Sequence, residues 1–233
     1  MKYYGFITVR TGSSRLKKKC LLKFGKFKIL DHIILRARKS DITPILCTTH
    51  STSDNVLETI AKKRNIKIFR GSINNKIKRW RDCADKFKIN YFHTIDADDV
   101  FFDPISVKKS IKLCRTNYGI IYPSKISSEG GASEGYSFSY RLINKINNNI
   151  KKNYKNFYNL DTEMIEKFIN RKKFKVKIFN GLSYQIKNVR LTLDYVEDYK
   201  MLKKVRNKCG NFASRKKINF FLKKNYDVVK INY

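Results

Sequence analysis

Residues 9–21, VRTGSSRLKKKCL, include six residues that could hold a polyphosphate. In chain order these are Arg10, Gly12, Ser13, Ser14, Arg15 and Lys19. The glycine leaves a backbone N–H open, the serines add hydroxyl donors and the cations supply fixed positive charge, a set that suits a triphosphate. We therefore predict that all six residues bind the phosphates of a ligand. The segment lacks both G-x-x-x-x-G-K-[ST] and G-x-G-x-x-G, so an ordinary basic surface turn is the alternative.

Two aspartates could supply the acidic counterpart of this loop. Asp98 and Asp194 each follow a segment with the pattern of a buried strand, one in each half of the chain. They could therefore converge at one edge of a sheet, where their carboxylate oxygens would suit Mg²⁺. A helix cap or a turn is the plainer interpretation of each, and Asp96 and Asp99 compete with Asp98 for the role.

Strand and helix patterns alternate along the chain, which predicts a mainly parallel sheet covered by helices on both faces. The expected strands span residues 3–9, 44–49, 66–69, 90–95, 119–123 and 189–194. The expected helices span residues 28–40, 53–65, 74–87, 103–114, 161–170, 196–207 and 214–225. No linker divides the chain, so we expect one domain over residues 1–233. The basic loop follows the first strand, and that edge is where open α/β sheets bind ligands.

Several helix ends carry capping signals. Ser53 and Asp54 precede the second helix, and Asp103 with Pro104 forms a cap followed by proline at the first helical position. Asp198 falls in the first turn of a later helix, where negative charge is favourable. Between about residues 124 and 170 the pattern loosens, and residues 127–139 resemble a loop or hairpin.

The formal charge of +33, from 52 Lys and Arg against 19 Asp and Glu, raises the possibility of a nucleic-acid partner. Tyr154, Phe157 and Tyr158 do lie among lysines. However, Lys, Asn, Ile and Tyr are enriched along the whole chain, as an AT-rich genome would produce, so we interpret most of the charge as solvated surface. A nucleic-acid partner is therefore not expected, whereas an anionic small ligand is.

Cysteine usage and hydropathy favour a cytoplasmic protein. The five cysteines are scattered without a C-x-x-C pair, so neither disulfides nor a zinc site are indicated. The three histidines show no metal-ligand spacing. We find no secretion signal and no run of about 20 apolar residues that could span a membrane.

The chain resembles the cytidylyltransferases that make CMP-activated sugar acids, the CMP-Kdo and CMP-sialic acid synthetases and the spore-coat polysaccharide synthesis protein F group. VRTGSSRLKKKCL resembles their R-x-G-S-x-R-L-P-x-K-x-L signature. LCTTHSTSDN (46–55), IFRGS (68–72), DADDVFFDP (96–104) and RLTLDYVEDY (190–199) resemble further family motifs in the same order, and EGYSFS (134–139) does so more weakly. Five ordered motifs are hard to obtain by chance.

This resemblance implies a Rossmann-like nucleotide-diphosphosugar-transferase fold and transfer of CMP from CTP to a sugar acid for surface polysaccharide synthesis. It implies that the six loop residues bind the nucleotide, with Arg10 and Lys19 also acting in catalysis, that Asp98 and Asp194 hold Mg²⁺, and that residues 124–170 bind the acceptor and form a homodimer. Arg70 is a candidate contact to the base or ribose, and a solvated arginine at the end of a strand is the alternative. Three positions depart from the family: Lys17-Lys18 replaces Pro-Gly, Ala97 replaces Gly, and Met164 aligns near a frequent His.

A glycosyltransferase of similar fold is the other enzyme that the sequence allows. Asp96-Ala97-Asp98 is a D-x-D triplet, which such enzymes use to hold a metal on a nucleotide-sugar. The basic loop argues against this alternative, because a nucleotide-sugar has no triphosphate to bind.

Overall fold

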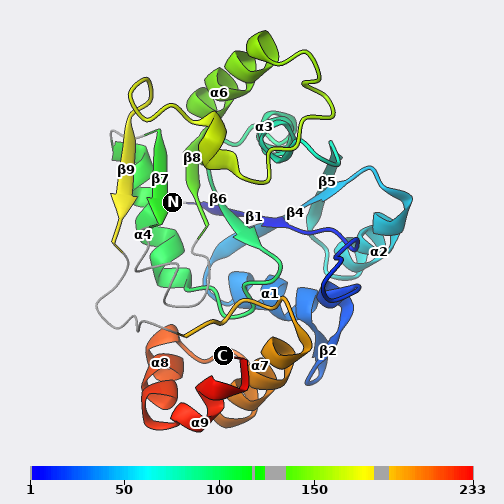
Figure 1. The fold of residues 1–233 in the computed structure, drawn as a ribbon, viewed down its shortest axis with the longest axis vertical. Helices are drawn as coiled ribbons and strands as arrows, with labels where there is room; N and C mark the ends of the chain where they lie inside the picture. The colour runs from blue at the N-terminus through cyan, green and yellow to red at the C-terminus, as the bar shows by residue number, and fades with distance from the viewer. Residues whose placement is uncertain (1, 117–118, 124–134, 181–188, 233) are drawn as a thin grey trace.

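A central sheet organises the computed structural model, which describes residues 2–116, 119–123, 135–180 and 189–232 (Figure 1). Within these ranges the spatial order of its strands is β5 (Lys67–Gly71), β4 (Ile42–Thr49), β1 (Tyr3–Thr8), β6 (Tyr91–Asp96), β8 (Ser137–Ser139), β7 (Ile120–Pro123) and β9 (Val176–Phe179). Only β8 runs antiparallel to its neighbours, β6 and β7, while the other pairs are parallel. The predicted mainly parallel sheet is confirmed.

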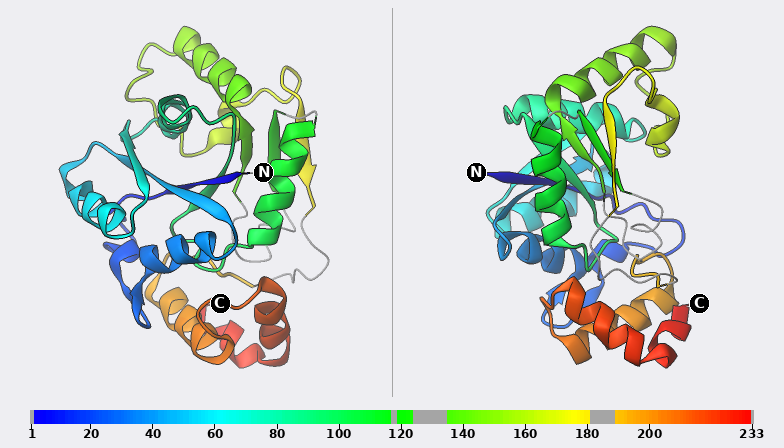
Figure 2. Two further views of the ribbon diagram at one scale, coloured as in Figure 1. Left: turned by 180° about the vertical axis from the view of Figure 1, so that it is seen from behind. Right: turned by 90° about the vertical axis from the view of Figure 1, so that its left-hand side faces the viewer.

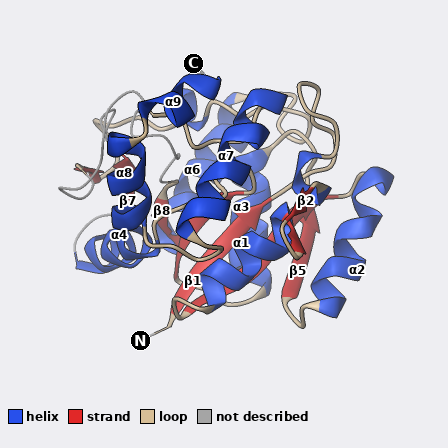
Figure 3. Ribbon diagram, turned by 90° about the horizontal axis from the view of Figure 1, so that it is seen from below, coloured by secondary structure: helices blue, strands red, loops and turns tan. Residues whose placement is uncertain are grey.

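Helices cover both faces of the sheet, as predicted (Figures 1 and 2). One core packs α3 (Lys76–Lys86) and α6 (Tyr140–Asn153) against the sheet. The other core contains α1 (Ile29–Arg38), α2 (Asn55–Lys63), α4 (Pro104–Thr116), α7 (Val196–Cys209), α8 (Arg215–Lys224) and α9 (Tyr226–Val229). Figure 3 is viewed from the side of α1 and α7. No described helix is long and apolar enough to cross a membrane.

Short elements connect these layers. A hairpin joins β2 (Lys23–Phe24) to β3 (Phe27–Lys28). Single turns of 3₁₀-helix occur at η1 (Lys19–Leu21), η2 (Thr52–Asp54), η3 (Ile165–Phe168) and η4 (Lys230–Asn232). The predicted cap at Asp103 is confirmed, because its carboxylate accepts from the backbone N–H of Ile105 while Pro104 opens α4.

The prediction of a strand over residues 189–194 is wrong. This segment is irregular and pairs with no strand among the described residues. Its apolar side chains Val189, Leu191 and Leu193 are buried in the core that contains α7 and α8. Alternating hydrophobicity indicates that one face of a segment is buried. It does not show that the backbone of the segment is hydrogen-bonded to another strand.

The sequence reasoning also misjudged the region before this segment. The helix expected over residues 161–170 is a single 3₁₀ turn, η3, and α6 and β9 were not anticipated. Helix α6 buries Ile143, Ile146 and Ile150 on one face, but the surrounding Asn and Lys obscured that spacing. The loop or hairpin expected over residues 127–139 contains β8, and its residues 127–134 lie outside the described ranges.

Leu191 tests whether the segment over residues 189–194 contributes to the core without being a strand. We expect Leu191→Ala to lower the free energy of unfolding by about 2–5 kcal/mol, since the side chain is fully buried. Urea denaturation measures this change. Val196→Ala, at a half-exposed position nearby, is the control and should have little effect. Equal, small effects of both variants would contradict the packing described here.

Candidate active site

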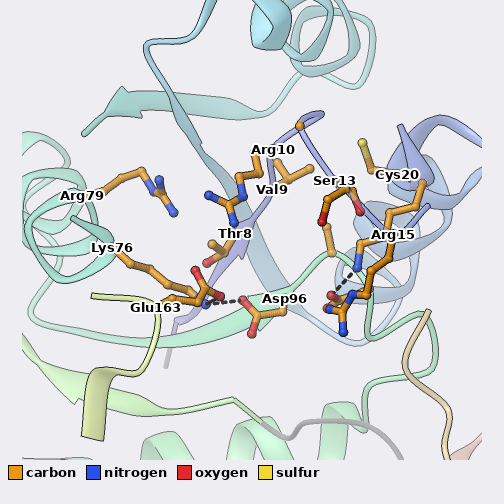
Figure 4. Close-up of a pocket in the computed structure, with 15 residues that line it drawn as sticks. Thr8, Val9, Arg10, Ser13, Arg15, Cys20, Lys76, Arg79, Asp96 and Glu163 are labelled. Atoms are coloured by element: carbon orange, nitrogen blue, oxygen red, sulfur yellow. Dashed lines mark hydrogen bonds and ion pairs between the residues drawn. The ribbon is translucent and has the colours of Figure 1, made fainter. Parts of the chain in front are cut away.

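A cavity of about 190 Å³ lies at the carboxyl ends of β1 and β6 (Figure 4). These two strands end side by side, with Thr8 paired to Asp96, so the segments that follow them meet at this edge. The structure brings together the six predicted loop residues and one predicted aspartate. The cavity is lined by Arg10, Gly12, Ser13, Ser14, Arg15, Lys19 and Asp98.

The ammonium of Lys19 joins the loop to both predicted aspartates. Its Nζ lies 2.7 Å from Oδ2 of Asp98 and 3.0 Å from Oδ1 of Asp194. It also donates to the backbone carbonyl of Leu193 at 2.8 Å. The expected convergence of Asp98 and Asp194 is therefore present, although the strand invoked for Asp194 is not.

Burial and charge oppose each other within this cluster. Burial by itself would lower the pKa of Lys19, but the attraction of Asp98 and Asp194 outweighs it and the pKa lies above its ordinary value. Burial, followed by the neighbouring charge of Asp96, raises the pKa of Asp98, and the Lys19 ammonium acts in the other direction. Lys19 is thus held as a cation.

Asp194 owes its position to the start of α7. The carboxylate of the buried Asp198 accepts from the backbone N–H groups of Asp194 and Tyr195, at 2.8 and 2.7 Å. This confirms that Asp198 belongs to the first helical turn. The Asp194 carboxylate also accepts a hydrogen bond from Nη2 of Arg15 at 2.8 Å.

Asp98 and Asp194 fit the predicted role of holding a divalent metal ion. One ammonium contacts an oxygen of each, so the two carboxylates face a common point that already receives a cation. Carboxylate oxygens are also the ligands that Mg²⁺ prefers.

The two competing aspartates are engaged elsewhere. Asp96, Asp98 and Asp99 do lie together, with ligand atoms within 4.8 Å of one another. However, Asp96 pairs with Lys76, and Asp99 is buried and accepts from the Thr192 hydroxyl. Burial, then the charges of Asp98 and Asp96, raises the pKa of Asp99 well above its ordinary value. Of the three, only Asp98 shares a cation with Asp194 in the described structure.

The wall opposite the loop contains residues that the sequence reasoning missed. Lys76 is buried and lies 3.3 Å from carboxylate oxygens of both Asp96 and Glu163. Arg79, one turn along α3, donates to the backbone carbonyl of Ser72. Figure 4 shows Lys76, Arg79 and Glu163 on one side of the cavity and Arg15 on the other. Among 52 basic residues, neither cation carried a distinguishing signal.

Arg70 is the one predicted nucleotide-binding residue that the structure does not bring to the cavity. Its guanidinium donates to the backbone carbonyls of Thr49 and Ser51 and to the side chains of Asn55 and Glu58. These contacts fasten the end of β4 to the start of α2. A nucleotide contact by Arg70 remains a prediction without support from this position.

Asp54 anchors the start of the basic loop. It was expected to cap α2, but its side chain caps nothing there and points into the protein instead. Oδ1 accepts from the backbone N–H and hydroxyl of Thr11, both at 2.8 Å. Oδ2 accepts from the hydroxyls of Thr48 and Thr49. The T-x-x-x-x-D motif from Thr49 to Asp54 was the available signal, because its two ends bind each other.

These hydrogen bonds predict a pH-dependent contribution to stability. Burial by itself would raise the pKa of Asp54, but the donors, Thr49 foremost, hold it below its ordinary value. We expect Asp54→Asn to lower the free energy of unfolding at neutral pH by about 2–3 kcal/mol, since the amide presents a donor to other donors.

The deficit of Asp54→Asn should shrink in acid. A carboxylate with a depressed folded-state pKa stabilises the fold above the ordinary value of about 3.9 and loses that contribution as pH falls through the folded-state pKa. Urea unfolding of both proteins from neutral pH to about pH 3 measures it. A deficit that does not change with pH would contradict a charged Asp54.

Two curated relatives match the chain. The uncharacterized protein MJ1063 of Methanocaldococcus jannaschii is 28% identical over 242 residues, which covers all of this chain and 95% of the relative. The spore coat polysaccharide biosynthesis protein SpsF of Bacillus subtilis is 28% identical over 104 residues, 42% of this chain and 43% of that protein.

Solved structures of similar fold include two that match over most of their length. A cytidylyltransferase from Leptospira borgpetersenii superimposes with a TM-score of 0.81 at 24% identity and covers 98% of this chain and 97% of its own. A CMP:2-keto-3-deoxy-manno-octonic acid synthetase complexed with CTP gives a TM-score of 0.67 at 12% identity, covering 89% and 99%. These matches confirm the expected nucleotide-diphosphosugar-transferase fold.

The family itself is decided by a match that spans most of the chain. Residues 5–205 match the cytidylyltransferase family, and this range includes the basic loop, Asp98 and Asp194. The enzyme class expected from the ordered motifs is confirmed: the chain belongs to the cytidylyltransferase family and is a CTP-using nucleotidyltransferase.

Proposed function

We propose that this enzyme transfers CMP from CTP to a hydroxyl group of a sugar acid, such as Kdo, sialic acid or a relative, for surface polysaccharide synthesis. The observation that carries the proposal is the position of the basic loop, in one cavity with Asp98 and bonded to Asp194. A glycosyltransferase using the D-x-D triplet is disfavoured, because the basic loop lines the same cavity as Asp96 and Asp98 and a nucleotide-sugar has no triphosphate for that loop to bind.

In the proposed reaction the acceptor oxygen attacks the α-phosphorus. The bond between the α-phosphorus and the oxygen that bridges to the β-phosphate breaks, pyrophosphate leaves, and the hydroxyl proton passes to solvent. Arg10, Arg15 and Lys19 hold the phosphates and stabilise the charge that develops on the leaving pyrophosphate. Ser13 and Ser14 add hydroxyl donors. Catalysis then consists of positioning and electrostatics, without a covalent intermediate on the protein.

Asp98 and Asp194 are the residues that would hold Mg²⁺. When bound, the ion would neutralise negative charge on the α-phosphate and the pyrophosphate. The two aspartates also orient Lys19 and Arg15, because they accept from both cations.

The acceptor and the assembly complete the proposal. Glu163 reaches the cavity wall from the region assigned to the acceptor, and it precedes Met164, the position that departs from the family. A homodimer formed through residues 124–170 is also part of the proposal, and it rests on the family resemblance of that region. The cytoplasm is favoured as the site of reaction by five free, buried cysteines.

Nucleotide binding tests the metal assignment without knowledge of the acceptor. We expect calorimetry to show that Mg²⁺ strengthens CTP binding, with UTP, GTP and ATP binding more weakly. In the presence of Mg²⁺, Asp98→Ala should weaken CTP binding roughly 10- to 100-fold. The control Asp227→Ala, at an exposed position, should leave CTP binding unchanged. Binding of all four nucleotides alike, abolished by salt, would show that the loop is merely basic.

Gly12 tests the predicted contact with phosphate. A Cβ added there would meet no described atom within 4 Å, so the fold does not require a glycine at this position. We expect Gly12→Ala to change the free energy of unfolding by less than about 0.5 kcal/mol and to weaken CTP binding, because the methyl group would obstruct the phosphates. Unfolding and calorimetry measure both effects. Unchanged CTP affinity would remove Gly12 from the site.

A further inference from the structure

The three N–H groups of the Lys19 ammonium are all used by the protein itself. They point to Asp98 Oδ2 at 2.7 Å, Asp194 Oδ1 at 3.0 Å and the Leu193 carbonyl at 2.8 Å. An ammonium has three donors, so none is left for a phosphate in this arrangement. The side chain of Lys19 is also only 14% exposed.

The same arrangement leaves no place for a second cation between the carboxylates. Lys19 contacts one oxygen of each aspartate, and Arg15 contacts the Asp194 oxygen that Lys19 also uses. A divalent ion at this point would lie beside a buried ammonium of like charge, which disfavours its binding. Lys19 must therefore move before both aspartates can hold a metal.

A triphosphate provides the reason for Lys19 to move. The loop residues line the cavity in which the phosphates are proposed to bind. A triphosphate there attracts the ammonium more strongly than two carboxylates whose charge a metal ion neutralises. Arg15 is suited to the same exchange, because its side chain is 53% exposed and bonded to Asp194 alone among the described carboxylates.

We propose that Lys19 holds the place of the divalent cation between Asp98 and Asp194 until CTP arrives, and then transfers to the triphosphate. This inference rests on the proposed function and adds an order of events: the nucleotide releases the metal site. Binding of metal and nucleotide is then coupled, and each strengthens the other by the same factor. The free enzyme binds the metal weakly, because its own lysine competes.

Removing the lysine charge should open the metal site without any nucleotide. In Lys19→Met and Lys19→Gln, Asp98 and Asp194 face each other without a cation of their own between them. We expect both variants to bind Mn²⁺ roughly tenfold or more tightly than the wild type, a factor typical of coupled sites. The glutamine keeps a donor to the carboxylates, which guards against misfolding, and thermal melting checks both proteins.

A matched control separates the local contact from the overall charge. Lys17 lies in the same loop and is exposed, so Lys17→Met removes the same charge without touching either aspartate. The experiment measures Mn²⁺ binding to nucleotide-free wild type, Lys17→Met, Lys19→Met and Lys19→Gln by electron paramagnetic resonance. Adding Asp98→Asn to Lys19→Met should abolish the gain, since the ion then lacks one ligand.

The outcomes distinguish this inference from the proposed function. Mn²⁺ affinity that rises only in the Lys19 variants supports it, whereas equal affinity in wild type and Lys19 variants, or an equal gain in Lys17→Met, overturns it. CTP binding to the wild type in EDTA is measured separately by calorimetry. If CTP does not bind with or without metal, the proposed function fails, whatever the Mn²⁺ result.

Discussion

The ammonium of Lys19 holds together three segments that are far apart in the sequence. It joins the loop after β1 to Asp98, 79 residues later, and to Asp194, 175 residues later. Without a cation between them the two carboxylates would repel each other in a partly buried environment. The shape of the site therefore depends on charge neutralisation, and the sheet only brings the segments within reach.

Two buried aspartates hold the backbone around this contact. The Asp54 carboxylate accepts hydrogen bonds from Thr11 at the start of the loop and from Thr48 and Thr49 at the end of β4. Asp198 fixes the backbone of Asp194, and Asn232 near the chain end donates to Asp198 in turn. The 3₁₀ turn η4, which lies beyond residue 205 where the family match ends, thus supports a residue of the candidate site.

The large positive charge of the chain says little about what the protein does. Three buried cations have particular partners: Lys76 pairs with two carboxylates, Arg79 donates to a carbonyl, and Arg36 donates to the carbonyls of Phe102 and Ala213. The proposed site lies where a few cations meet carboxylates at the sheet edge.

The sequence by itself determined the parallel sheet, the basic loop and the pair Asp98 and Asp194, because hydrophobic periodicity and ordered motifs are local patterns. It did not reveal α6 or β9, because the Asn and Lys residues around their apolar positions obscured the spacing. Its alternating pattern also led to the wrong prediction of a strand over the buried segment 189–194. It also gave no sign of Lys76 and Glu163 in the cavity, or that Arg70 contacts α2 instead. Only the tertiary structure decided these points, since the direction and partner of a charged side chain depend on segments that lie far away in the chain.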